Sequence, residues 1–177
     1  MTDYRPPHPV FSKNIIEMLT VANEYCLFVE SIEKYNYADI LSYMLKLAPL
    51  LYLKGAMLPQ IEVSDEWANE RFVTEEQYIN IYNTILNKLD NKNLYKDADN
   101  ISMYDTELIE YNFAEVLADV YQDLKDFVLL YQKETLAAKE NAVFNCKLSF
   151  QNNWGKKMVS AMKYLHFKIS NETQSDL

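Results

Sequence analysis

The stretch NFAEVLADVYQDLKDFVLLY, residues 112–131, decides the fold class of this chain. Its apolar residues recur every three or four positions, a spacing that gathers them on one side of an α-helix. This apolar stripe consists of Leu117, Val120, Leu124, Phe127 and Tyr131. Asn112 followed by Glu115 predicts a capping box at the start of the helix. A helix with one apolar stripe buries it against neighbours, so the stretch predicts a bundle of helices.

The same helix carries a row of carboxylates. Glu115, Asp119, Asp123 and Asp126 are spaced four, four and three residues apart. This spacing places all four on one face, opposite the apolar stripe, where their like charges repel one another. The favoured interpretation is a solvated face. The alternatives are a surface for a protein partner, a basic one included, and a site for a metal ion.

Two helices are predicted before this stretch, in the N-terminal third of the chain. The first begins after Ser12, a good N-cap residue, and runs to about Lys34. The second begins near Asn36 and continues to Gly55. Pro49 either kinks this second helix or opens a new one at its first turn.

A third helix and the last helix complete the pattern. The third opens with a capping box formed by Thr74 and Gln77. The last begins at Thr135 and carries Trp154 in the middle of its apolar stripe. Both patterns are typical of amphipathic helices that pack on a shared core.

These elements predict an all-α fold, a single antiparallel, up-and-down bundle of five or six helices over residues 11–167. Residues 1–10 read as a flexible arm and residues 168–177 as a flexible polar tail. Residues 59–73 are expected to form a loop or a partial helix, and residues 90–111 a long connection. No segment shows a strand period strong enough to predict a β-strand.

The chain contains only two glycines, Gly55 and Gly155. Phosphate-binding loops, dinucleotide-binding turns and nucleophile elbows depend on glycine for backbone conformations that other residues adopt only at a cost. These classes of site are therefore excluded in their usual form. Gly155 lies inside a helical pattern, where it costs up to about 1 kcal/mol relative to alanine, so it is expected to allow a close approach of another element.

Composition and charge limit the location and the partners. The 177 residues carry a formal net charge of −9, and an acidic surface disfavours nucleic acid and anionic membranes. The longest apolar stretch, residues 40–58, is interrupted by Lys46 and Lys54, which is not typical of a membrane span. Cys26 and Cys146 both fall among apolar residues, as buried free thiols do. We therefore expect a soluble, cytoplasmic protein that needs no cofactor.

Four stretches resemble an uncharacterised, all-helical family of unknown function from Bacteroidetes-type bacteria. They are Phe11-Ser12-Lys13-Asn14, LAPLLYLKGAMLP at 47–59, DVYQDLKDF at 119–127, and WGKK at 154–157 with Leu165-His166. The resemblance spans about residues 10–167 and implies a helical fold. It implies nothing about activity.

A second likeness concerns all-α nucleotide pyrophosphohydrolases, which hold Mg²⁺ with Glu-x-x-Glu on one helix and Glu-x-x-Asp on the next. Here Glu107 and Glu110 match the first pair. Asp123 and Asp126 stand where the second pair is expected, but Asp123 replaces the glutamate of that pair. In a chain with 26 acidic residues such pairs arise easily by chance. The leading hypothesis is a non-enzymatic interaction or scaffold module, and the alternative is a divalent-metal-dependent hydrolase of this type.

Overall fold

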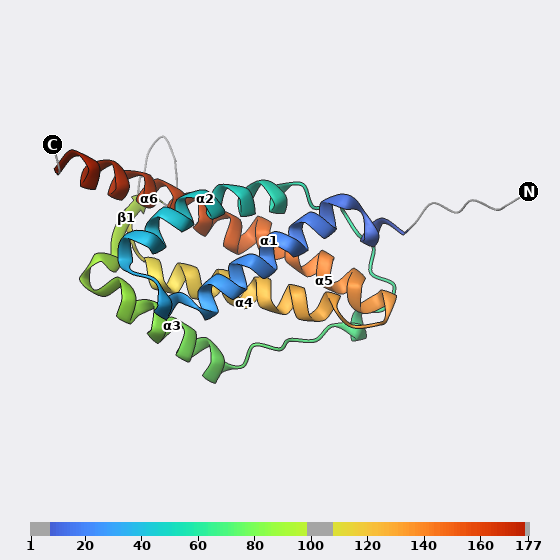
Figure 1. The fold of residues 1–177 in the computed structure, drawn as a ribbon. Helices are drawn as coiled ribbons and strands as arrows, with labels where there is room; N and C mark the ends of the chain where they lie inside the picture. Colours follow the sequence, from blue (N-terminus) through green and yellow to red (C-terminus); the bar gives the residue numbers. More distant parts are fainter. Residues whose placement is uncertain (1–7, 99–107, 176–177) are drawn as a thin grey trace, which may run out of the picture.

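The structure, a computed structural model, describes residues 8–98 and 108–175. Its described part contains α1 (Lys13–Glu30), α2 (Tyr37–Ala56), α3 (Glu75–Leu89), α4 (Phe113–Tyr131), α5 (Leu136–Ser149) and α6 (Gly155–Ser175). Figure 1 shows the helices running alternately in opposite directions along the bundle, except that α6 continues in the direction of α5. The predicted all-helical, antiparallel bundle is confirmed.

Helix α4 occupies the centre of the bundle and packs against α1, α3 and α5. All residues of its predicted apolar stripe are buried. The side chain of Asn112 accepts a hydrogen bond from the backbone N–H of Glu115 at 3.1 Å, which is one of the two bonds of the predicted capping box. The buried hydroxyl of Tyr25 on α1 donates to the carbonyl oxygen of Leu117 at 2.8 Å and ties the first helix to this centre.

The other helix starts follow the capping residues closely. Thr74 and Gln77 form both bonds of the predicted capping box. Asn36 caps α2, which continues through Pro49 as one helix to Ala56. Helix α1 ends earlier than predicted, at Glu30, and Ile32–Lys34 form a separate 3₁₀ turn. These boundaries are local, and short-range capping signals were sufficient to predict most of them.

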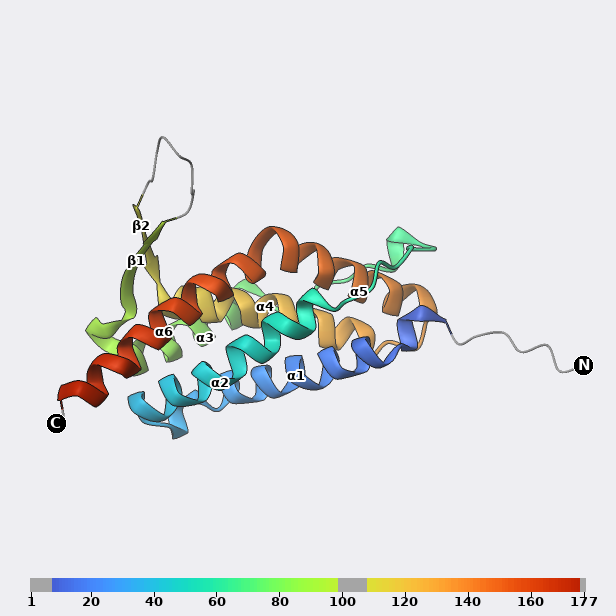
Figure 2. The same ribbon diagram turned by 90° about the horizontal axis from the view of Figure 1, so that it is seen from above.

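The long connection predicted at residues 90–111 contains a β-hairpin, which corrects the expectation that no segment forms a β-strand. Strands β1 (Leu94–Ala98) and β2 (Leu108–Asn112) pair antiparallel, with Tyr95 opposite Tyr111. The ring of Tyr95 stacks on Tyr111 and on Tyr164 of α6, with centroids 5.5 and 4.7 Å apart. Figure 2 shows the hairpin standing beside α6. These short strands lack a long alternation of apolar and polar residues. Aromatic stacking on a helix that is distant in the sequence stabilises them instead.

The predicted last helix is one long rod interrupted by a π-helical turn. Helix α5 starts after its cap Thr135, the turn spans Phe150–Trp154, and α6 follows and packs against α2. A Cβ atom on Gly155 would collide with the carbonyl oxygen of Phe150, and one on Gly55 would lie 2.5 Å from Cη2 of Trp154. Both glycines therefore allow a close approach, as expected for Gly155, and neither has a positive φ.

Both predicted ends of the bundle need correction. Residues 8–10 are not part of a flexible arm, because Pro9–Phe11 form a 3₁₀ turn and Val10 is fully buried. The carbonyl oxygen of Val10 accepts a bond from the hydroxyl of Tyr131 at 3.0 Å. At the other end, α6 continues through residues 168–175, which were assigned to a polar tail. Residues 1–7 of the predicted arm and 176–177 of the tail lie outside the described residues.

Both cysteines are buried, as the sequence predicts. Burial raises the pKa of the Cys26 thiol to about 12 and raises the pKa of Cys146 as well. The reactive thiolate is therefore almost absent in the folded protein at pH 8, and a thiol reagent such as Ellman's reagent is expected to react slowly with the native chain and quickly with the unfolded chain. Fast modification of either native cysteine would show that it lies at the surface.

Candidate functional site

The carboxylate row of α4 is not a solvated face, which corrects the favoured interpretation. Only Glu115 is exposed, whereas Asp119, Asp123 and Asp126 are partly buried. Asp119 accepts a bond from the hydroxyl of Tyr78 on α3 at 2.7 Å and pairs with Lys157 on α6. The row lies opposite the main apolar stripe, but its three aspartates face other parts of the chain, and only Glu115 faces solvent.

Asp126 and Asp123 hold neighbouring segments in place. One oxygen of Asp126 accepts bonds from the backbone N–H groups of Phe72 and Val73 at 2.8 and 2.9 Å. Asp123 accepts bonds from the side chains of Ser149 and Asn153, the latter at 3.0 Å. Burial raises the pKa of Asp123, and those two hydrogen bonds oppose the shift. The two carboxylates therefore attach the chain before α3, and the turn after α5, to the central helix.

Replacing Asp126 with alanine is expected to lower the free energy of unfolding by about 1–2 kcal/mol, because two backbone N–H groups lose a charged acceptor. A denaturant melt measures this loss. Glu115→Ala removes an exposed carboxylate of the same row and is expected to change stability by less than about 0.5 kcal/mol. Equal effects of the two substitutions would contradict the assigned role of Asp126.

A cleft of about 320 Å³ lies over this part of α4 and α5, and Asn69, Arg71, Asp123 and Asn145 are among its lining residues. Much of its polar lining is already satisfied within the protein. Asn145 donates to the side-chain oxygen of Asn69 at 3.0 Å, and Asp123 is bonded as described above. The cleft is thus a polar seam between the 69–73 segment and the bundle.

The metal site of the alternative hypothesis is not assembled in the part of the chain that the structure describes. Glu107 lies outside that part, and Glu110 is an exposed residue of β2 paired with Lys96 across the hairpin. Asp123 and Asp126 accept the hydrogen bonds within the chain that are described above. Among the described residues, no three His, Cys, Asp or Glu side chains come together in a way that could hold a metal ion.

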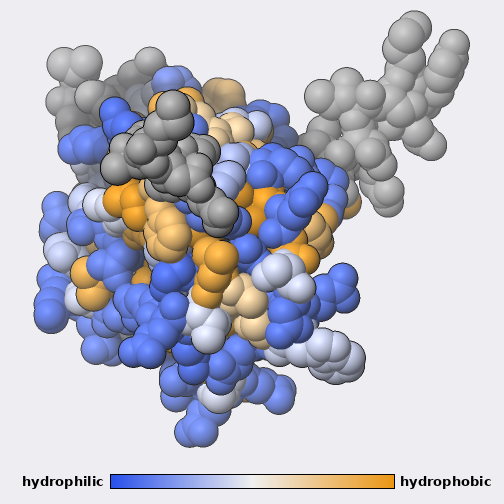
Figure 3. Space-filling view, turned by 90° about the vertical axis from the view of Figure 1, so that its right-hand side faces the viewer, coloured by the Kyte–Doolittle hydropathy of each residue, from blue (hydrophilic) through white to orange (hydrophobic). Residues whose placement is uncertain are grey.

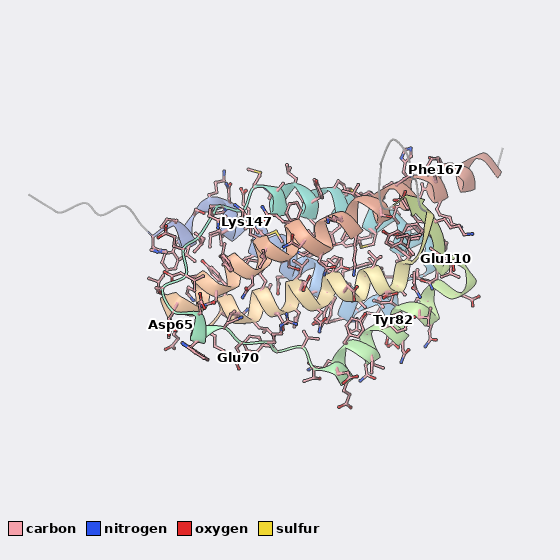
Figure 4. All side chains as sticks on the ribbon, turned by 180° about the vertical axis from the view of Figure 1, so that it is seen from behind. Asp65, Glu70, Tyr82, Glu110, Lys147 and Phe167 are labelled. Carbon is pink, nitrogen blue, oxygen red and sulfur yellow. The ribbon has the colours of Figure 1, made fainter. Side chains whose placement is uncertain are left out.

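The most unusual surface feature is Trp67, whose side chain is 95% exposed. It lies in the middle of a short 3₁₀ turn, Glu66–Ala68, within the connection between α2 and α3. We call residues 62–70 the Trp67 segment. Figure 4 shows two of its residues, Asp65 and Glu70, at the end of the bundle opposite to Glu110 and Phe167. A large indole left outside the core is uncommon in a folded domain and marks this segment as a candidate interaction site.

Hydrogen bonds fix the backbone on the N-terminal side of Trp67. The carboxylate of Asp65 accepts a bond from the backbone N–H of Trp67 at 3.0 Å, which caps the turn. The side chain of Asn141 on α5 donates to the carbonyl oxygen of Asp65 at 2.8 Å. Ser64 donates to Glu140 through both its backbone N–H, at 2.9 Å, and its hydroxyl, at 2.5 Å. The turn is therefore attached to α5 immediately before the exposed indole.

Glu140 is the anchor of this attachment. It is only 3% exposed, and Nε2 of His8 lies 3.4 Å from its second oxygen. A buried carboxylate is costly unless it is hydrogen-bonded, and Ser64 supplies two donors. The hydroxyl of Ser64 donates to Glu140 rather than to His8, so the three residues do not form a nucleophile–histidine–carboxylate relay. The cluster is structural.

A groove of about 540 Å³ runs beside the Trp67 segment, against α5. Its apolar lining is Ile61, Val63 and Phe144, and its carboxylates are Glu62 and Glu66. Figure 3 views the bundle from this end and shows a largely hydrophilic surface with several apolar residues exposed among the hydrophilic ones. The groove therefore combines an apolar wall with two carboxylates, and one of them, Glu66, directly precedes Trp67 in the chain.

Residues 59–73 were predicted to form a loop or a partial helix, and Trp67 was not predicted to be a site residue. One signal was present. Residues 62–70 contain four acidic residues, no basic residue and no apolar period, so the single tryptophan among them had no predicted core to join. None of the four residues proposed for the partner surface lies in this segment.

Comparison with known proteins places the chain in a family without defining an activity. No helix in the described part of the chain has the length and apolar character needed to cross a membrane. No curated protein matches the chain. The crystal structure of protein BF1032 from Bacteroides fragilis is similar, with 35% identity, a TM-score of 0.80, and coverage of 90% of this chain and 94% of that one. Residues 9–170 match DUF5063, a domain of unknown function, and the chain therefore belongs to this family, as its resemblance to an uncharacterised helical family implied.

Proposed function

We propose that this protein is a non-enzymatic interaction module that binds a protein partner through the Trp67 segment. The observation that carries the proposal is the 95% exposed indole of Trp67 on a backbone that is hydrogen-bonded to α5. Tryptophan is enriched among the residues that dominate binding energy at protein interfaces. A fixed backbone also reduces the conformational entropy that a partner must overcome on binding.

The proposed location is the cytoplasm, and nucleic acid is not the proposed partner. Free, buried cysteines are compatible with a reducing compartment. The net charge of −9 repels phosphate groups, so a protein partner is favoured. The supporting observations are thus the charge, the thiols and the exposed indole.

Site-specific cross-linking in the source cells tests this function. A photoreactive phenylalanine analogue at position 67 is expected to form an adduct with one defined protein, and the same analogue at position 167 is not. Phe167 is a suitable control because it is 58% exposed and lies at the opposite end of the bundle (Figure 4). Trp67→Ala is then expected to abolish co-purification of that same protein. Identical adducts from both positions, or none from position 67, would contradict the proposed function.

A further inference from the structure

We infer that the Trp67 segment and its groove bind an arginine- or lysine-containing segment of the partner, an inference that rests on the proposed function. The predicted contacts are a cationic head group over the indole of Trp67 and next to Glu62 and Glu66. The partner's aliphatic stem would lie along the apolar wall of the groove.

The charge of the Trp67 segment selects a cationic partner. Residues 62–70 carry four carboxylates and no basic side chain. Glu70 is paired with Lys133 at 3.0 Å, and Asp65 caps the turn that carries Trp67. Glu62 and Glu66 are exposed and form no ion pair with any residue in the described ranges 8–98 and 108–175. A positive side chain would supply the missing counter-charge beside the indole.

The shape and chemistry of the groove favour a long side chain over a bare ion. Tryptophan is the best aromatic partner for a cation, and arginine can stack its planar guanidinium on the ring. Lysine and arginine also carry long methylene stems that bury against apolar surface while the charge stays hydrated. Val63 and Phe144 provide such a surface within the groove. Apolar side chains offer no ligand to a metal ion, so this wall would not contribute to metal binding.

A titration with defined peptides tests the inference. The probe is a fluorescein-labelled peptide of alternating arginine and alanine, and the comparison peptides replace arginine with glutamine or glutamate. We expect the arginine peptide alone to bind at an ionic strength of about 0.1 M, where the Debye length is about 10 Å. Trp67→Ala is expected to weaken binding by more than about tenfold, and Glu62→Gln with Glu66→Gln by about tenfold.

A charge-matched control separates this site from general attraction to an acidic protein. Glu33→Gln with Glu110→Gln also removes two exposed carboxylates, and Figure 4 places Glu110 at the opposite end of the bundle from Asp65. This variant is expected to bind the arginine peptide within about twofold of the wild type, because charges beyond a Debye length of about 10 Å are largely screened. Equal weakening by both double variants would overturn the inference.

The outcomes of this titration and of the cross-linking are distinguishable. If position 67 captures a defined protein but the arginine peptide does not bind, the proposed function stands and the cationic partner is wrong. If free spermidine competes with the peptide at equal or lower concentration, recognition of a peptide segment is wrong, because the stem and backbone then add nothing. If the arginine peptide binds the wild type and Trp67→Ala abolishes this binding, the inference is supported independently of the partner's identity.

Discussion

Replacing Trp154 with alanine is expected to lower the free energy of unfolding by about 3–5 kcal/mol, the range found for large aromatic residues removed from a core. Trp154 is fully buried at the end of the π-helical turn between α5 and α6. Its ring makes an edge-on contact with Phe150, with centroids 4.8 Å apart, and lies against Gly55 on α2. The substitution would leave a cavity where three elements meet.

Equilibrium unfolding in urea measures this effect, and the second tryptophan of the chain provides the control. Trp67→Ala removes the same side chain from a position that is 95% exposed, so its effect is expected to stay below about 0.5 kcal/mol. A loss below 1 kcal/mol for Trp154→Ala would show that the junction of α5 and α6 does not depend on this ring.

Gly155→Ala is expected to destabilise the protein by about 2–3 kcal/mol, although alanine is the better helix former by about 1 kcal/mol. The added methyl group would collide with the carbonyl oxygen of Phe150 and lie 2.9 Å from its ring. A backbone oxygen cannot move aside as a flexible side chain can, so the π-helical turn itself must shift.

The control for this substitution is an alanine at an exposed helical position. Asn83→Ala, in α3, is expected to be neutral or slightly stabilising because of the higher helix propensity of alanine. Thermal or urea melts of both variants give the comparison. If Gly155→Ala were as stable as the wild type, the close contact at the π-helical turn would be wrong.

The helices could be predicted from the sequence because their signals are local. The apolar stripe of 113–131 and the capping residues Asn36, Thr74 and Thr135 act within one or two turns of the helix that they define. The close approach at Gly155 was also predictable, since glycine inside a strong helical pattern needs a packing reason. Such local signals identify a helix without any knowledge of which elements are its neighbours.

The hairpin and the role of the carboxylate row depend on distant contacts and could not be predicted in this way. Tyr95 stacks on Tyr164, which lies 69 residues further along the chain. Asp126 was predicted to be solvated because helical periodicity separates the polar face of a helix from its apolar face. Periodicity does not show that the backbone N–H groups of Phe72 and Val73, which need an acceptor, lie against the polar face. A polar face on a central helix can be a second packing surface.

Trp67 was missed for the opposite reason, because its importance lies in the absence of intramolecular packing. A hydrophobic residue in a loop is ordinarily expected to cover part of the core, and only the surrounding carboxylates argued against this. Its fixed position depends on Asn141 and Glu140, which lie more than 70 residues further along the chain. The candidate site therefore emerges from the tertiary structure and from a single exposed residue.

The central claim is that the indole of Trp67 is exposed to solvent on a turn that hydrogen bonds hold in place. Acrylamide quenching of tryptophan fluorescence tests this claim most directly. The emission of Trp67 is the difference between the wild type and Trp67→Phe, which retains only the buried Trp154. We predict that this difference emission is red-shifted and quenched nearly as strongly as that of free tryptophan. A blue-shifted emission protected from acrylamide would show that the indole packs against the protein, and it would contradict the proposed docking surface.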